Sequence, residues 1–417
     1  MSCGICYSVS AASTGPSAEE EAVGSDRHQH PAAVVSERIR MEPLRCRHDR
    51  VTDWMAANGV DALVAARPDL VTWLAGYSRY YGGLSAVVVG RDGERVLAVA
   101  RDEVAVAERL SDADRVIGYG VRGFGIELDP APLMLGAVGE LAVVSSARRI
   151  ATAGEPVAGF TPPAGGDTVP ADAALHQLSL VKDADELARI YHSYELCWVA
   201  QAAVADGAAA GATEIEIMTA AQGAAQIAHG SPIEFAADLL AGANTAEVCG
   251  PIAIPGRTRA ESGQPVVADI CIGAGGYWAD TCRTHVSGTN TEIADIYQQL
   301  HAILDAAAAE LRSGATGAQV FGGMRDRILA YRPDGEFPHH GGHGVGLSVF
   351  DDPHVIPTDQ QRLENWMVLA LEPGIYLPGR FGVRRENLFL VTPDGGVELT
   401  EALARPLDPR AQIGWAA

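Results

Sequence analysis

Residues 266–284 read VVADICIGAGGYWADTCRT, and their pattern is the clearest indication of how the surrounding chain folds. Two extended, partly β-branched runs flank a glycine-rich turn, which predicts a β-hairpin. Aspartate is disfavoured inside a strand, and a buried charge needs a partner. Strand alternation places Asp269 with Cys271 on one face and Asp280 with Cys282 on one face. A hairpin can bring both carboxylates to the same side, where they repel unless a proton or a cation lies between them.

A second chemical motif is PHHGGHGVGL, residues 338–347. Three histidines among four glycines predict neither a helix nor a strand, and glycine lets the backbone approach a neighbour closely. A lone histidine is more often a satisfied core residue than a ligand. The cluster of His339, His340 and His343 in a glycine-rich loop instead favours a metal-binding or catalytic role.

Two further carboxylates follow this loop. Glu372 ends the apolar run 367–371 and precedes Pro-Gly, and Glu386 lies in the strand-like run 382–391 with Arg384 on the same face. Four carboxylates and one imidazole suit two divalent ions better than one structural zinc. The alternative is a set of unrelated structural acids. The predicted metal ligands are Asp269, Asp280, His343, Glu372 and Glu386.

The rest of the sequence divides into regions of different composition. Residues 1–40 carry no hydrophobic periodicity and predict a disordered leader, with Met41 a candidate true start. Residues 42–160 alternate helix and strand patterns, which predicts a small α/β domain. Residues 161–180 are rich in proline and glycine and predict a linker. The region 181–417 contains all the motifs above.

Local patterns also predict individual elements. Strands are expected at 61–65, 85–89, 95–99 and 140–144, and helices at 102–110, 214–228, 292–312 and 317–331, with a further helix opening at Asp183.

The overall composition excludes some classes of partner. The 417 residues carry a formal net charge of −22, which repels nucleic-acid backbones and anionic lipids. No apolar run reaches the ~18 residues that span a bilayer. The seven cysteines are odd in number and widely spaced, so they predict no disulfide framework. We expect a cytoplasmic protein without nucleic-acid or membrane partners.

The motifs, taken in order, resemble the pita-bread metallohydrolases, the superfamily of methionine aminopeptidase, aminopeptidase P, prolidase and creatinase. The resemblance spans roughly residues 45–405 and rests on DICIG (269–273), GYWADTCRT (276–284), GHGVGL (342–347), EPG (372–374) and GVRRE (382–386). It implies an α+β fold, in which a creatinase-type N-terminal α/β domain precedes a pita-bread catalytic domain.

The resemblance also implies roles for the predicted ligands. Asp269 resembles the ligand of one ion, Asp280 and Glu386 the bridging ligands, and His343 and Glu372 the ligands of the other ion. Glu372 resembles the glutamate that takes a proton from the attacking water.

Two further residues resemble catalytic positions of the family. His339 stands four residues before His343, where the family keeps a substrate-side histidine, and Arg384 resembles the arginine beside the last glutamate. With Glu372, they are the candidate catalytic residues.

The substrate pocket departs from the peptidase pattern. Peptidases of the prolidase type carry His-Glu seven and eight residues after the histidine ligand, where this chain has Phe350 and Asp351. They also carry a histidine near the position of Cys249, which either faces the substrate or fills space. His340 offers one extra hydrogen-bond donor. We assign His340, Cys249 and Phe350 to the substrate pocket.

The function implied by this pattern is metal-dependent hydrolysis of an amide or peptide C–N bond in a small substrate, or dipeptide, by a hydroxide that bridges two divalent ions. Manganese is the expected metal, with cobalt, zinc and iron as alternatives, and Xaa-Pro specificity is open. Two other classes are a metal-dependent lyase acting on a small metabolite and a non-catalytic binding protein, although adaptors of this fold usually lose ligands. Relatives with this N-terminal domain pair, so we expect a homodimer, with Tyr77–Tyr81 as a candidate lid contact.

Overall fold

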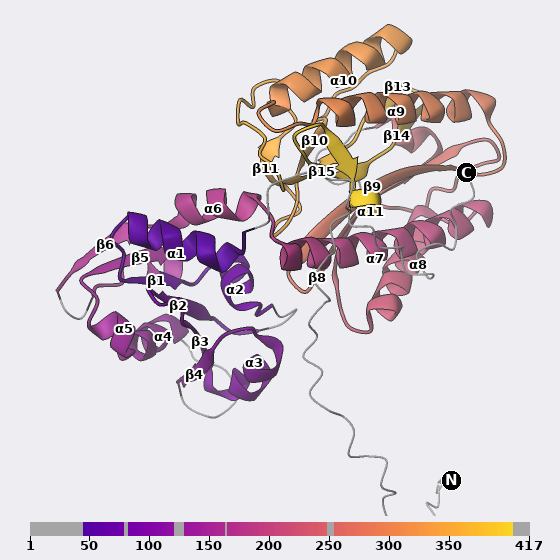
Figure 1. The fold of residues 1–417 in the computed structure, drawn as a ribbon. Coiled ribbons are helices and arrows are strands. Elements are labelled where there is room, and N and C mark those ends of the chain that lie inside the picture. The colour runs from indigo at the N-terminus through magenta and orange to yellow at the C-terminus, as the bar shows by residue number, and fades with distance from the viewer. Residues whose placement is uncertain (1–44, 79–81, 121–128, 163–164, 248–253, 403–417) are drawn as a thin grey trace, which may run out of the picture.

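The computed structural model describes residues 45–78, 82–120, 129–162, 165–247 and 254–402 (Figure 1). The predicted leader at 1–40, Met41 and Cys249 lie outside these residues. An N-terminal domain, indigo to magenta in Figure 1, lies beside a C-terminal domain that ends in orange and yellow. None of the described helices is long and apolar enough to cross a membrane.

The N-terminal domain is built on a six-stranded sheet of order β4-β3-β2-β1-β5-β6, with helices on both faces. Its strands are β1 (Ala62–Ala65), β2 (Ala86–Gly90), β3 (Arg95–Ala100), β4 (Arg115–Tyr119), β5 (Arg149–Ala153) and β6 (Asp167–Pro170). Its helices are α1 (Arg47–Ala57), α2 (Pro68–Ala75), α3 (Val104–Leu110), α4 (Pro130–Gly139), α5 (Ala142–Ser145) and α6 (Asp172–Leu180), with short 3-10 helices η1 (Arg101–Glu103) and η2 (Glu155–Val157).

Most of the predicted elements of this domain are confirmed, and one is wrong. Strands β1, β2 and β3 lie where the sequence predicts them, and β2 pairs antiparallel with both of the others. The strand predicted at 140–144 is instead the short helix α5. Only Leu141 and Val144 of that apolar run are buried, which is a helical spacing, and the central strand β5 follows it.

The segment 161–180, predicted as a linker, also differs in the structure. Its second half forms the edge strand β6, which pairs with β5, and the helix α6. Proline is tolerated at the end of an edge strand, so Pro170 does not prevent the pairing. Ala171 and Leu175 are fully buried in the core of the N-terminal domain. Composition alone therefore concealed two elements that complete this domain.

The C-terminal domain confirms the predicted mixture of helices and strands, so the fold is α+β. Its helices are α7 (Ala184–Ala209), α8 (Glu214–His229), α9 (Thr291–Glu310), α10 (Gly317–Tyr331) and α11 (Leu399–Ala402), with the 3-10 helix η3 (Gly242–Ala246). Its strands are β7 (Glu234–Ala241), β8 (Pro265–Ala274), β9 (Tyr277–Val286), β10 (Gly342–Gly344), β11 (Asp351–His354), β12 (Val368–Leu371), β13 (Gly374–Leu377), β14 (Phe381–Arg384), β15 (Asn387–Val391) and β16 (Gly396–Glu398).

The antiparallel sheet β7-β8-β9 packs one face against the long helix α7. Asp183 begins this helix with a capping box, in which its side chain accepts from the Glu186 amide and Glu186 accepts in return. Ala268 and Ile270 of β8 lie in the apolar core shared with α7. Because side chains alternate along a strand, Asp269 points to the opposite face.

A second sheet, β11-β10-β12-β15-β16, is covered on its outer face by α9 and α10. The predicted apolar stripe of α9 is buried there, including Ile296 and Leu300. The glycine-rich segment was expected to form no strand, and this is wrong for β10. Gly342 has φ +147°, and a Cβ there would lie 2.0 Å from the Ala370 carbonyl oxygen, so only glycine lets β10 lie against β12.

A buried ion pair joins the two domains. The Arg47 guanidinium on α1 lies 2.9 Å from the Asp183 carboxylate at the start of α7, and its Nε donates to the Trp73 carbonyl oxygen at 2.7 Å. Arg47 is 4% and Asp183 is 5% exposed. The charge of Asp183 therefore depends on Arg47 rather than on water.

We predict that Arg47→Ala lowers the free energy of unfolding by about 3–5 kcal/mol, because it leaves the buried Asp183 carboxylate without its counter-charge. The measurement is the urea midpoint followed by tryptophan fluorescence. The matched control is Arg45→Ala, since Arg45 pairs with Asp53 at the surface, where both side chains are more than half exposed. Equal midpoint shifts in the two variants would contradict a buried ion pair between the domains.

Candidate metal centre

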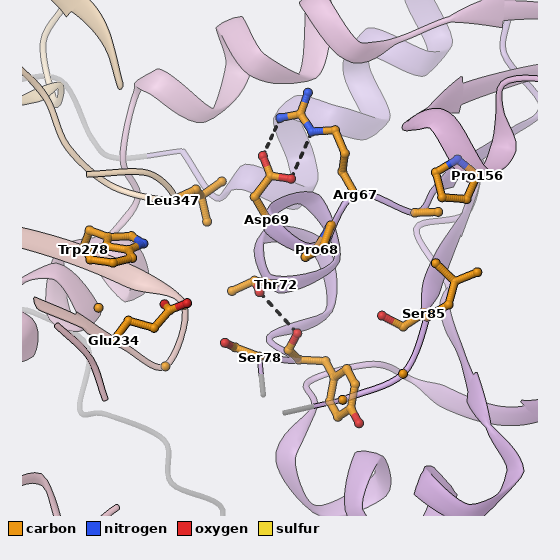
Figure 2. Close-up of a pocket in the computed structure, with 18 of the residues that line it drawn as sticks. Arg67, Pro68, Asp69, Thr72, Ser78, Ser85, Pro156, Glu234, Trp278 and Leu347 are labelled. Atoms are coloured by element: carbon orange, nitrogen blue, oxygen red, sulfur yellow. Dashed lines mark hydrogen bonds and ion pairs between the residues drawn. The ribbon is translucent and has the colours of Figure 1, made fainter. Parts of the chain in front are cut away.

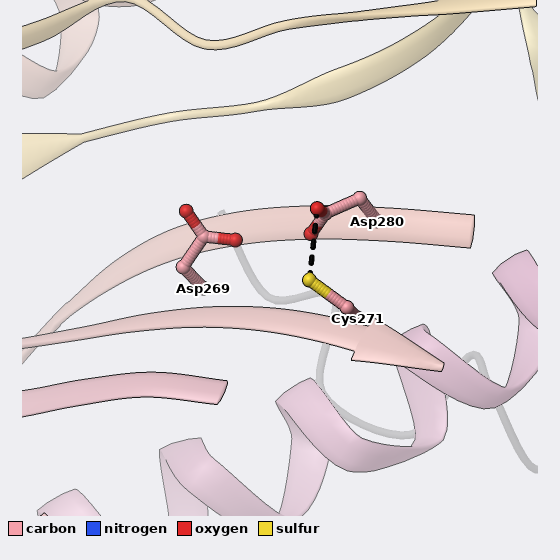
Figure 3. A group of neighbouring side chains, drawn as sticks. All are labelled: Asp269, Cys271 and Asp280. Carbon is pink, nitrogen blue, oxygen red and sulfur yellow. Dashed lines mark hydrogen bonds between the residues drawn. The ribbon is translucent and has the colours of Figure 1, made fainter. Parts of the chain in front are cut away.

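The predicted hairpin is present and aligns the two aspartates. In the β8–β9 ladder Cys271 lies opposite Asp280, and Asp269 lies opposite Cys282. Paired residues share a face, so all four side chains point away from α7. Figure 3 shows Asp269, Cys271 and Asp280 on this side of the hairpin, with the Cys271 Sγ 3.0 Å from the Asp280 Oδ2.

His343 enters the same space from β10. Its Nε2 lies 3.8 Å from the Asp280 Oδ2 and 3.8 Å from the Glu372 Oε1. Its Nδ1 lies 3.0 Å from the Gly344 carbonyl oxygen, which can only accept a hydrogen bond. This contact assigns the proton to Nδ1 and leaves the lone pair of Nε2 directed at the carboxylates, as a metal-binding histidine requires.

The two glutamates come from the ends of neighbouring strands. Glu372 directly follows β12, and Glu386 lies between β14 and β15, which divide the single strand-like run expected at 382–391. The Glu386 amide donates to the Cys282 carbonyl oxygen at 3.0 Å, so this connection is fixed to the hairpin. The structure thus brings all five predicted ligands into one buried group.

Several of these oxygen atoms have no protein partner. Both carboxylate oxygens of Glu386 and the Oδ1 of Asp280 are buried and accept no hydrogen bond within the described part of the chain. Burial, together with repulsion between the carboxylates, raises the pKa of both side chains well above its usual range. Asp280, His343 and Glu386 offer ligand atoms within 4.8 Å of one another. The site therefore fits a divalent cation, which would supply the missing charge and the missing bonds.

Arg384 on β14 contacts three carboxylates. Its Nη1 lies 3.1 Å from the Asp269 Oδ2 and 3.9 Å from the Glu372 Oε2, and its Nη2 lies 3.3 Å from the Asp238 Oδ2. Asp238 on β7 lies opposite Asp269 in the ladder, and the sequence analysis missed it. An aspartate inside the apolar segment FAADLLA, residues 235–241, was the available signal.

The two additional histidines occupy different environments. His339 Nδ1 lies 2.7 Å from the His340 carbonyl oxygen and its Nε2 lies 2.9 Å from the Tyr376 hydroxyl, so both ring nitrogens are engaged by the protein. Burial lowers the pKa of His339 to about 4. The His340 side chain is 33% exposed, and its Nδ1 lies 2.9 Å from the Glu372 Oε1. His340 is therefore the more accessible of the two, and Tyr376 is a second residue that the sequence analysis missed.

Phe350 lies beside the predicted ligands. Its ring centroid is 4.6 Å from that of His343 and 5.9 Å from that of His340, and the residue remains 42% exposed. A large apolar side chain thus borders the approach to the site. Cys249, the other predicted pocket residue, lies outside the described residues.

A cavity of about 800 Å³ lies between the two domains, next to the same sheet (Figure 2). Trp278 and Leu347 line it from the C-terminal domain and Arg67 from the N-terminal domain, where the guanidinium pairs with Asp69. Trp278 precedes Asp280 by two residues on β9, so both side chains point to the same face. The cavity is therefore reached from the same face of the sheet that carries the predicted ligands.

We predict that purified protein binds up to two divalent ions per chain and that Asp280→Ala binds neither, because this side chain contacts both halves of the ligand group. The number of ions bound per chain is measured by elemental mass spectrometry after dialysis against manganese, cobalt or zinc. Glu234→Gln is the control, since Glu234 lies on the same sheet but is exposed. Full metal occupancy in Asp280→Ala would contradict the assignment.

Comparisons with known proteins agree with this geometry. Residues 188–393 match the model of metallopeptidase family M24, and residues 47–153 match the creatinase/prolidase N-terminal domain. An uncharacterized peptidase of Staphylococcus aureus is 28% identical over 362 residues, which cover 84% of this chain and 97% of that protein.

Two solved structures share the fold. Dipeptidase PepE from Mycobacterium ulcerans is 26% identical with a TM-score of 0.62, over 87% of this chain and 96% of that one. Prolidase from Pyrococcus furiosus is 24% identical with a TM-score of 0.66, over 84% and 98%. The expected order of domains, creatinase-type and then pita-bread, is thereby confirmed, and the chain belongs to metallopeptidase family M24.

Proposed function

We propose that this protein hydrolyses a C–N bond of a small amide or dipeptide-like substrate, as Xaa-Pro peptidases do, but with an altered substrate pocket. The observation that carries the proposal is the convergence of five ligand-type side chains from separate strands, with buried carboxylate oxygens that lack protein partners. The related proteins named as prolidase and dipeptidase support a peptide-like substrate.

The proposed ligands divide between two divalent ions. As the resemblance implies, Asp269 would hold one ion, His343 and Glu372 would hold the other, and Asp280 and Glu386 would serve both. When bound, the ions supply Lewis-acid polarisation of a substrate carbonyl and make water a nucleophile at neutral pH.

Glu372 is the proposed proton acceptor. Burial opposes its ionisation, but His340, together with His339 and His343, outweighs this effect and lowers the pKa of the carboxyl to about 2. Glu372 is therefore ionised at neutral pH and can accept a proton from the attacking water. Arg384, which is buried and contacts Asp269, holds these carboxylates in place and is better described as a positioning residue.

His340 takes the role for which the sequence first suggested His339. Both ring nitrogens of His339 are engaged, by the His340 carbonyl and by Tyr376, so His339 supports the site from behind. His340 is partly exposed beside Glu372 and can donate a hydrogen bond to a substrate carbonyl oxygen. Such a donor replaces part of what the prolidase-type histidines provide.

Phe350 is the proposed cause of altered specificity. A phenyl ring cannot donate a hydrogen bond, and it borders His343 where prolidase-type peptidases carry histidine. The cavity lined by Trp278 and Arg67 provides space for a substrate group beyond a dipeptide. An apolar or extended substrate fits these surroundings better than a compact, polar one.

We predict that turnover of Gly-Pro and Ala-Pro is weak and that Phe350→His raises kcat by about 10²–10³, the effect typical of one oxyanion donor. We measure kcat from the rate at which proline is released in the presence of manganese, cobalt or zinc. Phe350→Leu controls for ring removal alone and should not gain activity. If the unmodified protein already turns these dipeptides over at roughly 10 s⁻¹, an ordinary rate for an enzyme, the pocket is not altered.

A homodimer is a further prediction, and its support is the resemblance to paired relatives. Tyr77 of the candidate lid segment is buried and its hydroxyl donates to Glu103, so it packs within its own domain. Residues 79–81 lie outside the described chain. Light scattering at micromolar concentration tests the pairing, and a single monomeric species would contradict it.

A further inference from the structure

We propose that Cys271 is an additional ligand of the metal centre and that its thiolate makes the centre favour zinc, cobalt or iron(II) over manganese. This inference rests on the proposed function for the existence of the centre itself. It goes beyond the five-residue ligand set, because it adds a sulfur donor and a choice of metal.

The pairing of β8 with β9 places Cys271 next to Asp280, one of the proposed bridging ligands. Cys271 on β8 lies opposite Asp280 on β9, and its Sγ is 3.0 Å from the Asp280 Oδ2. Asp269, Cys271 and Asp280 offer ligand atoms that all lie within 4.8 Å of one another. In Figure 3 the thiol and the Asp280 carboxylate point toward each other, with Asp269 on the same side of the sheet.

A second, independent observation indicates that this corner of the site requires a cation. Asp280 is 3% exposed, and its Oδ1 has no hydrogen-bond partner among the described residues. The Cys271 thiol, a weak hydrogen-bond donor, contacts the other carboxylate oxygen, Oδ2, and therefore leaves Oδ1 without a partner. An ion bound by the Asp280 carboxylate and the Cys271 sulfur would give both side chains a partner. Its binding displaces the thiol proton to solvent.

Cys197 and Cys282, the buried cysteines of the described chain, occupy different surroundings from Cys271. Cys197 on α7 lies behind the sheet, where its Sγ approaches the carbonyl oxygens of Ile270 and Ala279 at 3.5 and 3.6 Å. Cys282 shares the face of Cys271 and is fully buried, but it belongs to neither group of possible ligands found in the described residues. Of Cys197, Cys271 and Cys282, only Cys271 has its sulfur within hydrogen-bond distance of a carboxylate among the described residues.

A thiolate changes which ions the site prefers. Carboxylate and water ligands suit magnesium and manganese, whereas thiolate ligands favour zinc, cobalt and iron. Manganese was expected from the resemblance, in which the ligands are carboxylates and one histidine. A sulfur donor in the same cluster argues for a softer ion.

The test is the absorption spectrum of the full-length protein loaded with cobalt(II), with bound cobalt measured in the same sample. We expect a thiolate-to-cobalt charge-transfer band in the near ultraviolet, its loss in Cys271→Ser and its retention in the matched variant Cys282→Ser. Cobalt bound without the band, or a band that persists in Cys271→Ser, overturns the inference and leaves the five-ligand centre intact. Failure to bind cobalt at all overturns the centre and the proposed function with it.

A competition between zinc and manganese provides the second readout. Cys271→Ser should reduce the preference for zinc over manganese by about 10- to 100-fold, the size of effect typical of residues that tune a metal site. An unchanged preference contradicts the inference. The cobalt spectrum of the unmodified protein tests for a thiolate ligand without any variant. Circular dichroism of Cys271→Ser and Cys271→Ala verifies that both variants fold.

Discussion

The constraint on which this structure depends is the burial of four carboxylates in one place. Asp269, Asp280, Glu372 and Glu386 lie between two sheets, where water cannot screen their repulsion. Arg384 compensates Asp269 and Glu372, but the described residues provide no comparable cation for the buried oxygens of Asp280 and Glu386. A proton or a cation must offset this repulsion, and a divalent cation would also provide the bonds that the protein leaves these oxygens without.

The neighbouring helix α7 and Arg283 fix the backbone of the strands that carry these carboxylates. Cys197 and Gln201 of α7 contact backbone oxygens on the outer face of the hairpin, so α7 holds the strands that carry the aspartates. Arg283 donates to the carbonyl oxygens of Cys282 and Glu386, and its guanidinium lies 4.2 Å from the ring centroid of Trp198. The connection that presents Glu386 is thus tied to both the hairpin and the helix. Rigid strands rather than mobile loops present most of the proposed ligands.

The sequence predicted the parts of this site that are set by local rules. Alternation along two strands was enough to place Asp269 and Asp280 together, and the helix expected to open at Asp183 is α7. Tyr376 was missed because its role arises from a contact with His339 that no local pattern encodes. Asp238 did carry a local signal, its place in an apolar strand, but its partners come from cross-strand pairing and from Arg384. The strand predicted at 140–144 failed for a related reason: a short apolar run does not distinguish a strand from a helix until its buried side is known.

The ligand positions and the positions that border them differ in how freely their residues can change. Ligand positions tolerate little change, because removing one carboxylate or the histidine leaves the others facing uncompensated charge. Phe350 borders the ligand group but carries no charge, so a change at this position leaves no buried carboxylate uncompensated. Trp278 lies on the same face of β9 as Asp280, two residues away, and it lines the inter-domain cavity. A change of substrate at Phe350 or Trp278 leaves the electrostatic requirement of the centre intact, so we expect divergence within this fold to accumulate there first.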